Sequence, residues 1–322
     1  MTSEQARWFA ETFDKLVNSV GRAVLGKEDV IALAFTTMLA EGHLLLEDAP
    51  GTGKTQLAKS MAATVQGSHH RIQFTPDLLP SDVTGVTVYD QKSGEFEFHK
   101  GPIFASIVLA DEINRASPKT QSALLEVMEE GRVTVEGFPH EVGRPFMVIA
   151  TQNPIEQAGT YRLPEAQLDR FLMKTSIGYP GRSQTVQILS GSANRNFSSL
   201  VSPIITTKAI ADMIDLASTV HIDDAVLDYI AALSEHTRES KDTRLGVSIR
   251  GALAITRATK AWAAARGRNY VLPDDVKALI EPAWAHRIVL DPEAEFSGVT
   301  GAKVIERAVA SVAAPQDRQN AA

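Results

Sequence analysis

Short, continuous apolar runs alternate with amphipathic segments from about residue 43 to residue 179, and this alternation restricts the fold more than any other feature. The clearest runs, Ile107–Ala110 and Phe146–Ala150, contain no polar residue. Strands have this composition when both faces of their sheet are covered, as in a parallel sheet between two layers of helices. After Tyr179 such runs disappear, and residues 183–310 predict helices rich in Ala, Ile and Leu.

The change of pattern near Tyr179 predicts two domains. We expect an N-terminal helix at residues 1–24, an αβα sandwich with a parallel sheet at 25–182, and a smaller all-α lid domain at 183–312. Residues 313–322 are polar and predict a disordered tail. The most apolar early segment, Val30–Ala40, has only eleven residues, so we expect no membrane span.

Charge and cysteine content restrict the partners. The formal net charge is −7, which gives no general attraction to nucleic acids or anionic lipids. The chain contains no cysteine, so disulfides and cysteine-based zinc sites are excluded. Because the first residues lack the basic and apolar regions of a signal peptide, we expect a cytoplasmic location.

A glycine-rich loop joins the apolar run His43–Leu46 to an amphipathic helix. The residues predicted to bind phosphate are Asp48, Ala49, Pro50, Gly51, Thr52, Gly53, Lys54, Thr55 and Gln56. Small residues let backbone N–H groups surround an anion, and the following helix N-terminus adds partial positive charge. Lys54 would reach the β- and γ-phosphates of ATP, and the Thr55 hydroxyl would hold Mg²⁺. Asp48 stands where the usual pattern has its first glycine, so an ordinary strand–helix turn stays open as an alternative.

A second motif makes the nucleotide site more specific. The run Ile107–Ala110 ends in Asp111 and Glu112, and successive side chains of a strand point to opposite faces. Asp111 is therefore predicted to complete the Mg²⁺ site, and Glu112 to polarise the attacking water. Alone, such a pair often marks only a solvated strand end. Together with the phosphate loop, it predicts an ATP site.

Four blocks, in this order along the chain, resemble the MoxR group of AAA+ ATPases. They are Gln73–Asp82, Asn114–Glu126, Ala150–Glu156 and Leu163–Phe171. The resemblance implies that Asn153 contacts the γ-phosphate or the attacking water, that Arg170 is an arginine finger for the neighbouring subunit, and that Arg250 is a second sensor of the γ-phosphate. The alternatives are a turn cap for Asn153 and an ion pair with Asp169 or Glu165 for Arg170. Besides Asp48, this sequence departs from the family pattern at Ser117, Arg162 and Ile249.

The resemblance also implies the activity and the partners. Proteins of this group are Mg²⁺- and ATP-dependent ATPases that remodel or mature client protein complexes. They form homo-oligomeric rings, usually hexamers, and work with proteins that contain a von Willebrand factor A domain. Two other functions stay open: a nucleic-acid motor of a related clade, and an ATP-binding scaffold without hydrolysis.

Two hairpins bear on the choice between these functions. Alternating residues predict one hairpin around Gln91–Gly94 and a second around a turn at Gly137–Pro139. In related proteins, hairpins at these places project toward the pore or face of the ring. The second hairpin, Val133–Val142, contains no Lys or Arg, and this disfavours binding to a polyanion. His69 and His70 have no further ligand at metal-binding spacing, and we expect both in a solvated loop.

Overall fold

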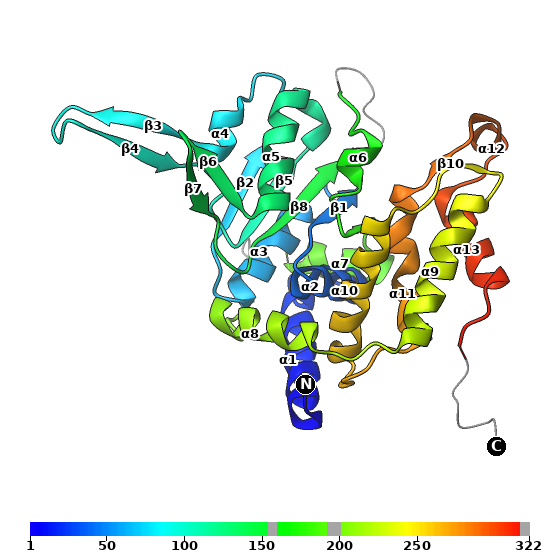
Figure 1. Ribbon diagram of the computed structural model, residues 1–322. Helices are drawn as coiled ribbons and strands as arrows, with labels where there is room; N and C mark the ends of the chain where they lie inside the picture. Colours follow the sequence, from blue (N-terminus) through cyan, green and yellow to red (C-terminus); the bar gives the residue numbers. More distant parts are fainter. Residues whose placement is uncertain (154–159, 192–200, 316–322) are drawn as a thin grey trace.

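A five-stranded parallel sheet forms the centre of the protein (Figure 1). The computed structural model describes residues 1–153, 160–191 and 201–315. The strand order is β2-β5-β8-β1-β9, and each neighbouring pair is parallel. The bounds are β1 (Leu44–Glu47), β2 (His69–Gln73), β5 (Ile107–Asp111), β8 (Met147–Gln152) and β9 (Met173–Thr175). All carboxyl ends therefore meet at one edge of the sheet, and all amino ends at the other.

Helices cover both faces of this sheet. One face carries α1 (Ser3–Gly21), α2 (Glu28–Leu39) and α3 (Lys54–Thr64), and the other carries α4 (Pro80–Thr84) and α5 (Pro118–Glu130). Within β1, Leu44 and Leu46 belong to the first core, whereas Leu45 belongs to the second. Consecutive residues of one strand are thus buried on opposite faces, which explains the continuous apolar runs. The predicted αβα sandwich is confirmed.

A helical part follows the sheet domain, as predicted. Its elements after α6 (Glu165–Leu168) are α7 (Arg182–Gly191), α8 (Thr207–Ser218), α9 (Asp224–Glu239), α10 (Ile249–Ala265), α11 (Pro273–Trp284), the 3₁₀ turn η3 (Ala285–Arg287), α12 (Pro292–Phe296) and α13 (Gly301–Ser311). Trp284 is fully buried, and its Nε1 donates to the carbonyl oxygen of Gly251 at 2.9 Å, which joins α11 to α10. The sequence missed one short antiparallel pair here, β10 (Thr243–Leu245) with β11 (Val289–Leu290), because such short strands show no periodicity.

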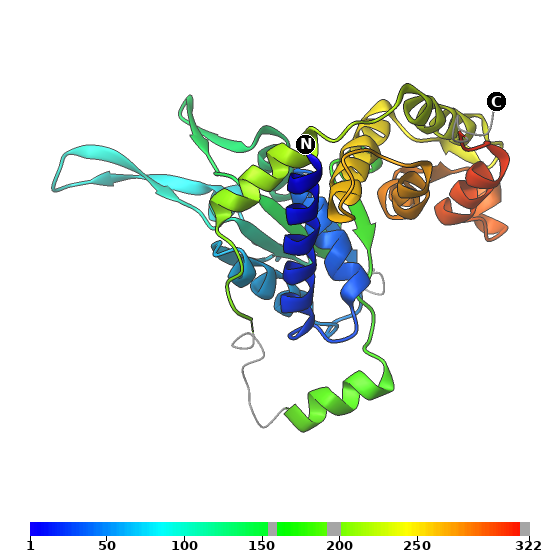
Figure 2. The ribbon, with the colours of Figure 1, turned by 90° about the horizontal axis from the view of Figure 1, so that it is seen from below.

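Two hairpins extend from the sheet domain. The longer one, β3 (Gly85–Asp90) with β4 (Glu95–Lys100), projects away from the side of the molecule that carries α9 to α13 (Figures 1 and 2). In the second hairpin, β6 (Arg132–Val135) with β7 (Phe138–Glu141), the predicted turn at Gly137–Pro139 is wrong. The turn consists of Glu136 and Gly137, with φ of 51° and 86°. Such a turn matches the twist of two paired strands, so Phe138 and Pro139 can join the strand.

Local sequence signals mark both the start and the end of α5. The Ser117 side chain accepts the backbone N–H of Thr120, Pro118 is the first helical residue, and Gly131 ends the helix with φ of 66°. The expectation for His69 and His70 was wrong, because both are residues of β2 rather than of a loop.

Candidate functional site

The predicted phosphate loop lies between β1 and α3, at the carboxyl edge of the sheet. Gly51 and Gly53 have φ of 84° and 95°, the left-handed region that favours glycine. Helix α3 begins at Lys54, so the free N–H groups of its first turn face the loop. The Lys54 ammonium turns back onto the loop and donates to the carbonyl oxygens of Asp48 at 3.1 Å and Ala49 at 3.3 Å.

The side chain of Asp48 has a structural partner that the sequence did not reveal. It is only 5% exposed, and its two carboxylate oxygens accept the backbone N–H groups of Ile177 at 2.6 Å and Gly178 at 2.8 Å. These hydrogen bonds tie the start of the loop to the segment that follows β9. An acidic side chain that faced a phosphate would repel it. The carboxylate of Asp48 instead accepts hydrogen bonds from two backbone N–H groups, which stabilise its negative charge.

Asp111 ends β5 at the same edge of the sheet. One carboxylate oxygen accepts the Thr151 hydroxyl at 2.6 Å, and the other pairs with the Arg71 guanidinium at 2.6 Å from Nη2. The sequence analysis missed Arg71 and Thr151, since their contacts depend on how β2, β5 and β8 lie side by side. Arg71 supplies positive charge at the carboxylate that was predicted to hold Mg²⁺.

Glu112 follows β5 in a strained backbone conformation, with φ of 56°. Its Oε2 accepts Gln73 Nε2 at 2.9 Å and Arg115 Nη1 at 2.9 Å. Its backbone N–H donates to the Thr151 hydroxyl at 2.9 Å. Gln73 and Arg115 belong to the sequence blocks that carried the resemblance, but neither was assigned a role from the sequence. The Glu112 side chain is therefore held in place by residues from β2 and from the 3₁₀ turn η1 (Ile113–Arg115).

Asn153 comes directly after β8 and is 8% exposed. Because β8 lies between β5 and β1, Asn153 reaches the same sheet edge as the phosphate loop and Asp111. Within the described residues, no three His, Cys, Asp or Glu side chains form a metal-binding group. The predicted Mg²⁺ ligands, Thr55 and Asp111, suit an ion that proteins hold by one or two ligands while phosphates and water complete its shell.

Arg170 and Arg250 lie at the opposite edge of the sheet. Arg170 precedes β9, where the Leu172 N–H donates to the carbonyl oxygen of His43 at the amino end of β1. Glu129, near the end of α5, pairs with Arg170 Nη2 at 3.1 Å and with Arg250 Nη2 at 2.5 Å. The four residues of β1 separate this edge from the phosphate loop by about 13 Å. In one chain, therefore, the two arginines are not brought to the predicted phosphate site.

This amino edge is rich in arginine. A cavity of about 170 Å³ is lined by the side chains of four arginines and three acids, namely Arg170, Arg250, Arg257, Arg287, Glu41, Glu129 and Asp169. Burial lowers the pKa of Arg287 to about 10 and also lowers the pKa of Arg257. Asp169 pairs with Arg287 at 3.0 Å, and Glu165 lies 3.9 Å from Arg244. Neither of these acids is the partner of Arg170, so the alternative partners considered from sequence are wrong.

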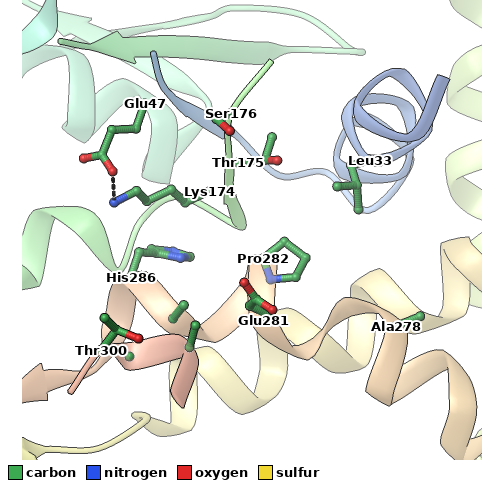
Figure 3. A pocket seen from close by; sticks show the side chains of 13 residues that line it. Leu33, Glu47, Lys174, Thr175, Ser176, Ala278, Glu281, Pro282, His286 and Thr300 are labelled. Carbon is green, nitrogen blue, oxygen red and sulfur yellow. Dashed lines mark ion pairs between the residues drawn. The ribbon is translucent and has the colours of Figure 1, made fainter. Parts of the chain in front are cut away.

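A larger cleft, of about 820 Å³, separates the sheet domain from the helical part (Figure 3). Its walls come from β1, β9, α2, α11, η3 and α13, and an ion pair between Lys174 and Glu47 at 2.7 Å lies within it. Burial lowers the pKa of His286 in its wall to about 3. Glu47 directly precedes the phosphate loop, but residues 48–56 do not line this cleft. None of the helices described here is long and apolar enough to cross a membrane.

Comparisons with known proteins agree with the geometry of the carboxyl edge. Residues 43–173 match the model of the ATPase family associated with various cellular activities (AAA), and residues 235–308 match an AAA lid domain. Chaperone MoxR1 of Mycobacterium tuberculosis is 37% identical over 319 residues, covering 95% of this chain and 83% of that protein. The chain belongs to the MoxR family of AAA+ ATPases.

Further relatives support the same assignment along the whole chain. Protein MoxR of Paracoccus denitrificans is 31% identical over 320 residues, covering 92% of this chain and 93% of that one. YeaC of Bacillus subtilis is 45% identical over 304 residues, covering 94% and 95%. The crystal structure of a candidate ATPase from Cytophaga hutchinsonii superposes with a TM-score of 0.91 at 37% identity, covering 97% and 98%. The resemblance inferred from the four sequence blocks is confirmed, and membership of the MoxR family implies nucleotide binding.

Proposed function

We propose that this MoxR-family protein hydrolyses Mg²⁺-ATP at the interfaces between subunits of a homo-oligomeric ring. One observation carries the proposal: residues suited to binding and hydrolysing ATP lie at the carboxyl edge of the sheet, and the arginine pair lies at the amino edge. A ring in which the amino edge of one subunit meets the carboxyl edge of the next would unite both halves. The first half alone binds nucleotide; the second adds positive charge where the transition state gains negative charge.

At the carboxyl edge, the loop N–H groups and Lys54 bind the phosphates, and Thr55 with Asp111 holds Mg²⁺. Mg²⁺ bound there would neutralise part of the phosphate charge. Glu112 orients the attacking water and accepts its proton, and Asn153 holds the water or the γ-phosphate. The fixed position of the Glu112 carboxylate, between Gln73 and Arg115, supports its role as a positioned base.

At the amino edge, we assign both Arg170 and Arg250 to the nucleotide of the neighbouring subunit. Their shared partner Glu129 supports a common role, and their distance from the phosphate loop of the same chain disfavours action within one subunit. We further propose the domain division at residues 182 and 183, motion of the lid during the cycle, a hexameric ring and a cytoplasmic location. The motion would remodel or mature a client protein complex together with a von Willebrand factor A domain protein.

Mixed rings test the assignment between subunits. Lys54→Ala should lose ATP binding, and Arg170→Ala should bind ATP but hydrolyse it slowly, because an arginine finger contributes about 10³–10⁵ in rate. Alone, Lys54→Ala should be inactive and Arg170→Ala should keep only slow turnover. In mixed rings, a Lys54→Ala subunit provides Arg170 to a subunit with an intact phosphate loop, so part of the activity should return.

A matched control is Arg244→Ala, which removes an exposed arginine near Glu165 and should leave hydrolysis unchanged. ATPase rates are measured on mixtures whose co-assembly is established by mass. Absence of recovery in rings that contain both variants would contradict the proposal.

A further inference from the structure

Among the described residues, Glu129 is the one acidic side chain that pairs with both arginines of the proposed interface. Each of its carboxylate oxygens accepts from a different guanidinium: Oε2 from Arg170 at 3.1 Å and Oε1 from Arg250 at 2.5 Å. All three side chains are partly exposed, at 38% for Glu129, 29% for Arg170 and 43% for Arg250. The arginines are therefore ordered by Glu129 and still accessible to an anion from outside the subunit.

The surrounding charges explain why an acid is needed at this position. Arg257 and Arg287 lie beside the pair; burial lowers the pKa of both, and the charge of Arg250 adds to this effect. Without a carboxylate between them, Arg170 and Arg250 would repel each other and move apart. Long arginine side chains also lose considerable rotamer freedom when they are fixed, and two charge-assisted hydrogen bonds offset that loss before any phosphate arrives.

The backbone beneath Glu129 is firmly held. The carbonyl oxygen of Met128 accepts His43 Nε2 at 2.9 Å, and the Gly131 N–H donates to Val127 at the end of α5. The next residue, Glu130, points elsewhere and pairs with Arg132 at 3.2 Å. A rigid helix end thus carries one acid toward the arginine pair and one acid away from it.

We propose that Glu129 is a positioning residue that holds Arg170 and Arg250 as one unit for the γ-phosphate bound by the neighbouring subunit. This inference rests on the function proposed above. Glu129 would set the distance between the two arginines without itself contacting nucleotide or metal. Glu129 acts through the arginines, so its loss should affect the rate of hydrolysis rather than ATP binding.

Steady-state kinetics of Glu129→Gln provide the first test. We expect kcat to fall by about 10- to 100-fold, because a small displacement of a positioned group costs up to that factor. The KM for ATP and the mass of the assembled ring should stay unchanged. Glu130→Gln is the matched control, and its kcat should equal that of the wild type. A wild-type kcat for Glu129→Gln would overturn the proposal.

Mixed rings locate the defect on one face of the subunit. Glu129→Gln mixed with Lys54→Ala should regain activity, whereas Glu129→Gln mixed with Arg170→Ala should not, because both defects then lie on the same face. If Lys54→Ala recovers with Arg170→Ala but not with Glu129→Gln, the role of Glu129 is refuted and the proposed function stands. If neither mixture recovers in co-assembled rings, the proposed function itself fails. Should Glu129→Gln not fold, Glu129→Asp replaces it, since it keeps the charge and shortens the reach by one methylene.

Discussion

A buried histidine beneath the arginine-rich edge should make the protein less stable in mild acid. His43 is 7% exposed; its Nε2 donates to the Met128 carbonyl oxygen at 2.9 Å, and its Nδ1 accepts the Val148 N–H at 3.0 Å. The bond from Val148 requires the neutral ring, because a proton on Nδ1 would face the N–H of Val148, whereas Nε2 can donate to Met128 in either protonation state. The pKa of His43 is lowered to about 4, mainly by burial and to a smaller extent by the charge of Arg257, while the hydrogen bond to Met128 acts in the opposite direction.

The size of this effect follows from proton linkage. Between pH 6.5 and about 4, the unfolded chain binds a proton at His43 that the folded protein does not bind. The free energy of unfolding therefore decreases as the pH falls through this window. From pH 7 to pH 5, His43 should account for a loss of about 2 kcal/mol. His43→Gln retains one donor and one acceptor but does not titrate, so its loss should be smaller by about this amount.

Urea denaturation of the wild type and His43→Gln at pH 7 and pH 5 measures this difference directly. Comparing the two proteins removes the contribution of His286, whose pKa is also lowered by burial, to about 3. His221→Gln changes an exposed histidine and should show the wild-type pH dependence. Equal losses of stability in the wild type and His43→Gln would refute the argument.

Three further predictions concern the rate of ATP hydrolysis and what it depends on. Glu112→Gln should bind ATP but hydrolyse it about 10²–10⁴ times more slowly, whereas Lys54→Ala should lose binding; wild-type turnover in Glu112→Gln would refute the proposed base. Arg71→Ala frees an oxygen of Asp111, so half-maximal hydrolysis should need about 1.5- to 5-fold less Mg²⁺, and an unchanged Mg²⁺ titration would exclude this competition. Duplex DNA should not stimulate hydrolysis, because Val133–Val142 lacks Lys and Arg; stimulation that falls steeply with salt would favour a motor.

Features encoded within a few neighbouring residues could be predicted from the sequence. The ends of α5 follow from Ser117 and Gly131, and the position of Asp111 follows from the apolar run before it. The prediction of the turn in the second hairpin was wrong because the sequence does not distinguish a three-residue turn at Gly137–Pro139 from a two-residue turn at Glu136–Gly137. Strand pairing and backbone twist decide between them.

Contacts between distant parts of the chain could not be predicted. Arg71 and Asp111 are 40 residues apart, and Glu129 and Arg250 are 121 residues apart. Both pairs depend on which strands and helices become neighbours, and neither leaves a local pattern. The backbone N–H groups after β9 that donate to Asp48 are also distant in sequence. For this reason the sequence alone does not explain why an aspartate stands where the family pattern has a glycine.

The position of Arg250 has the widest consequence for the enzyme. Its helix, α10, packs on α1, α2 and α8, and its first turn reaches Glu129 at the amino edge of the sheet. In this conformation, α10 keeps Arg250 away from the phosphate loop of its own chain, and bringing it there would break those contacts. An isolated subunit would then hold a phosphate loop and an acidic pair, whereas its Arg170 and Arg250 would lie at the other edge of the sheet. Under the proposed function, hydrolysis per chain should therefore rise with protein concentration as rings form, and a rate independent of concentration would place the whole catalytic site within one subunit.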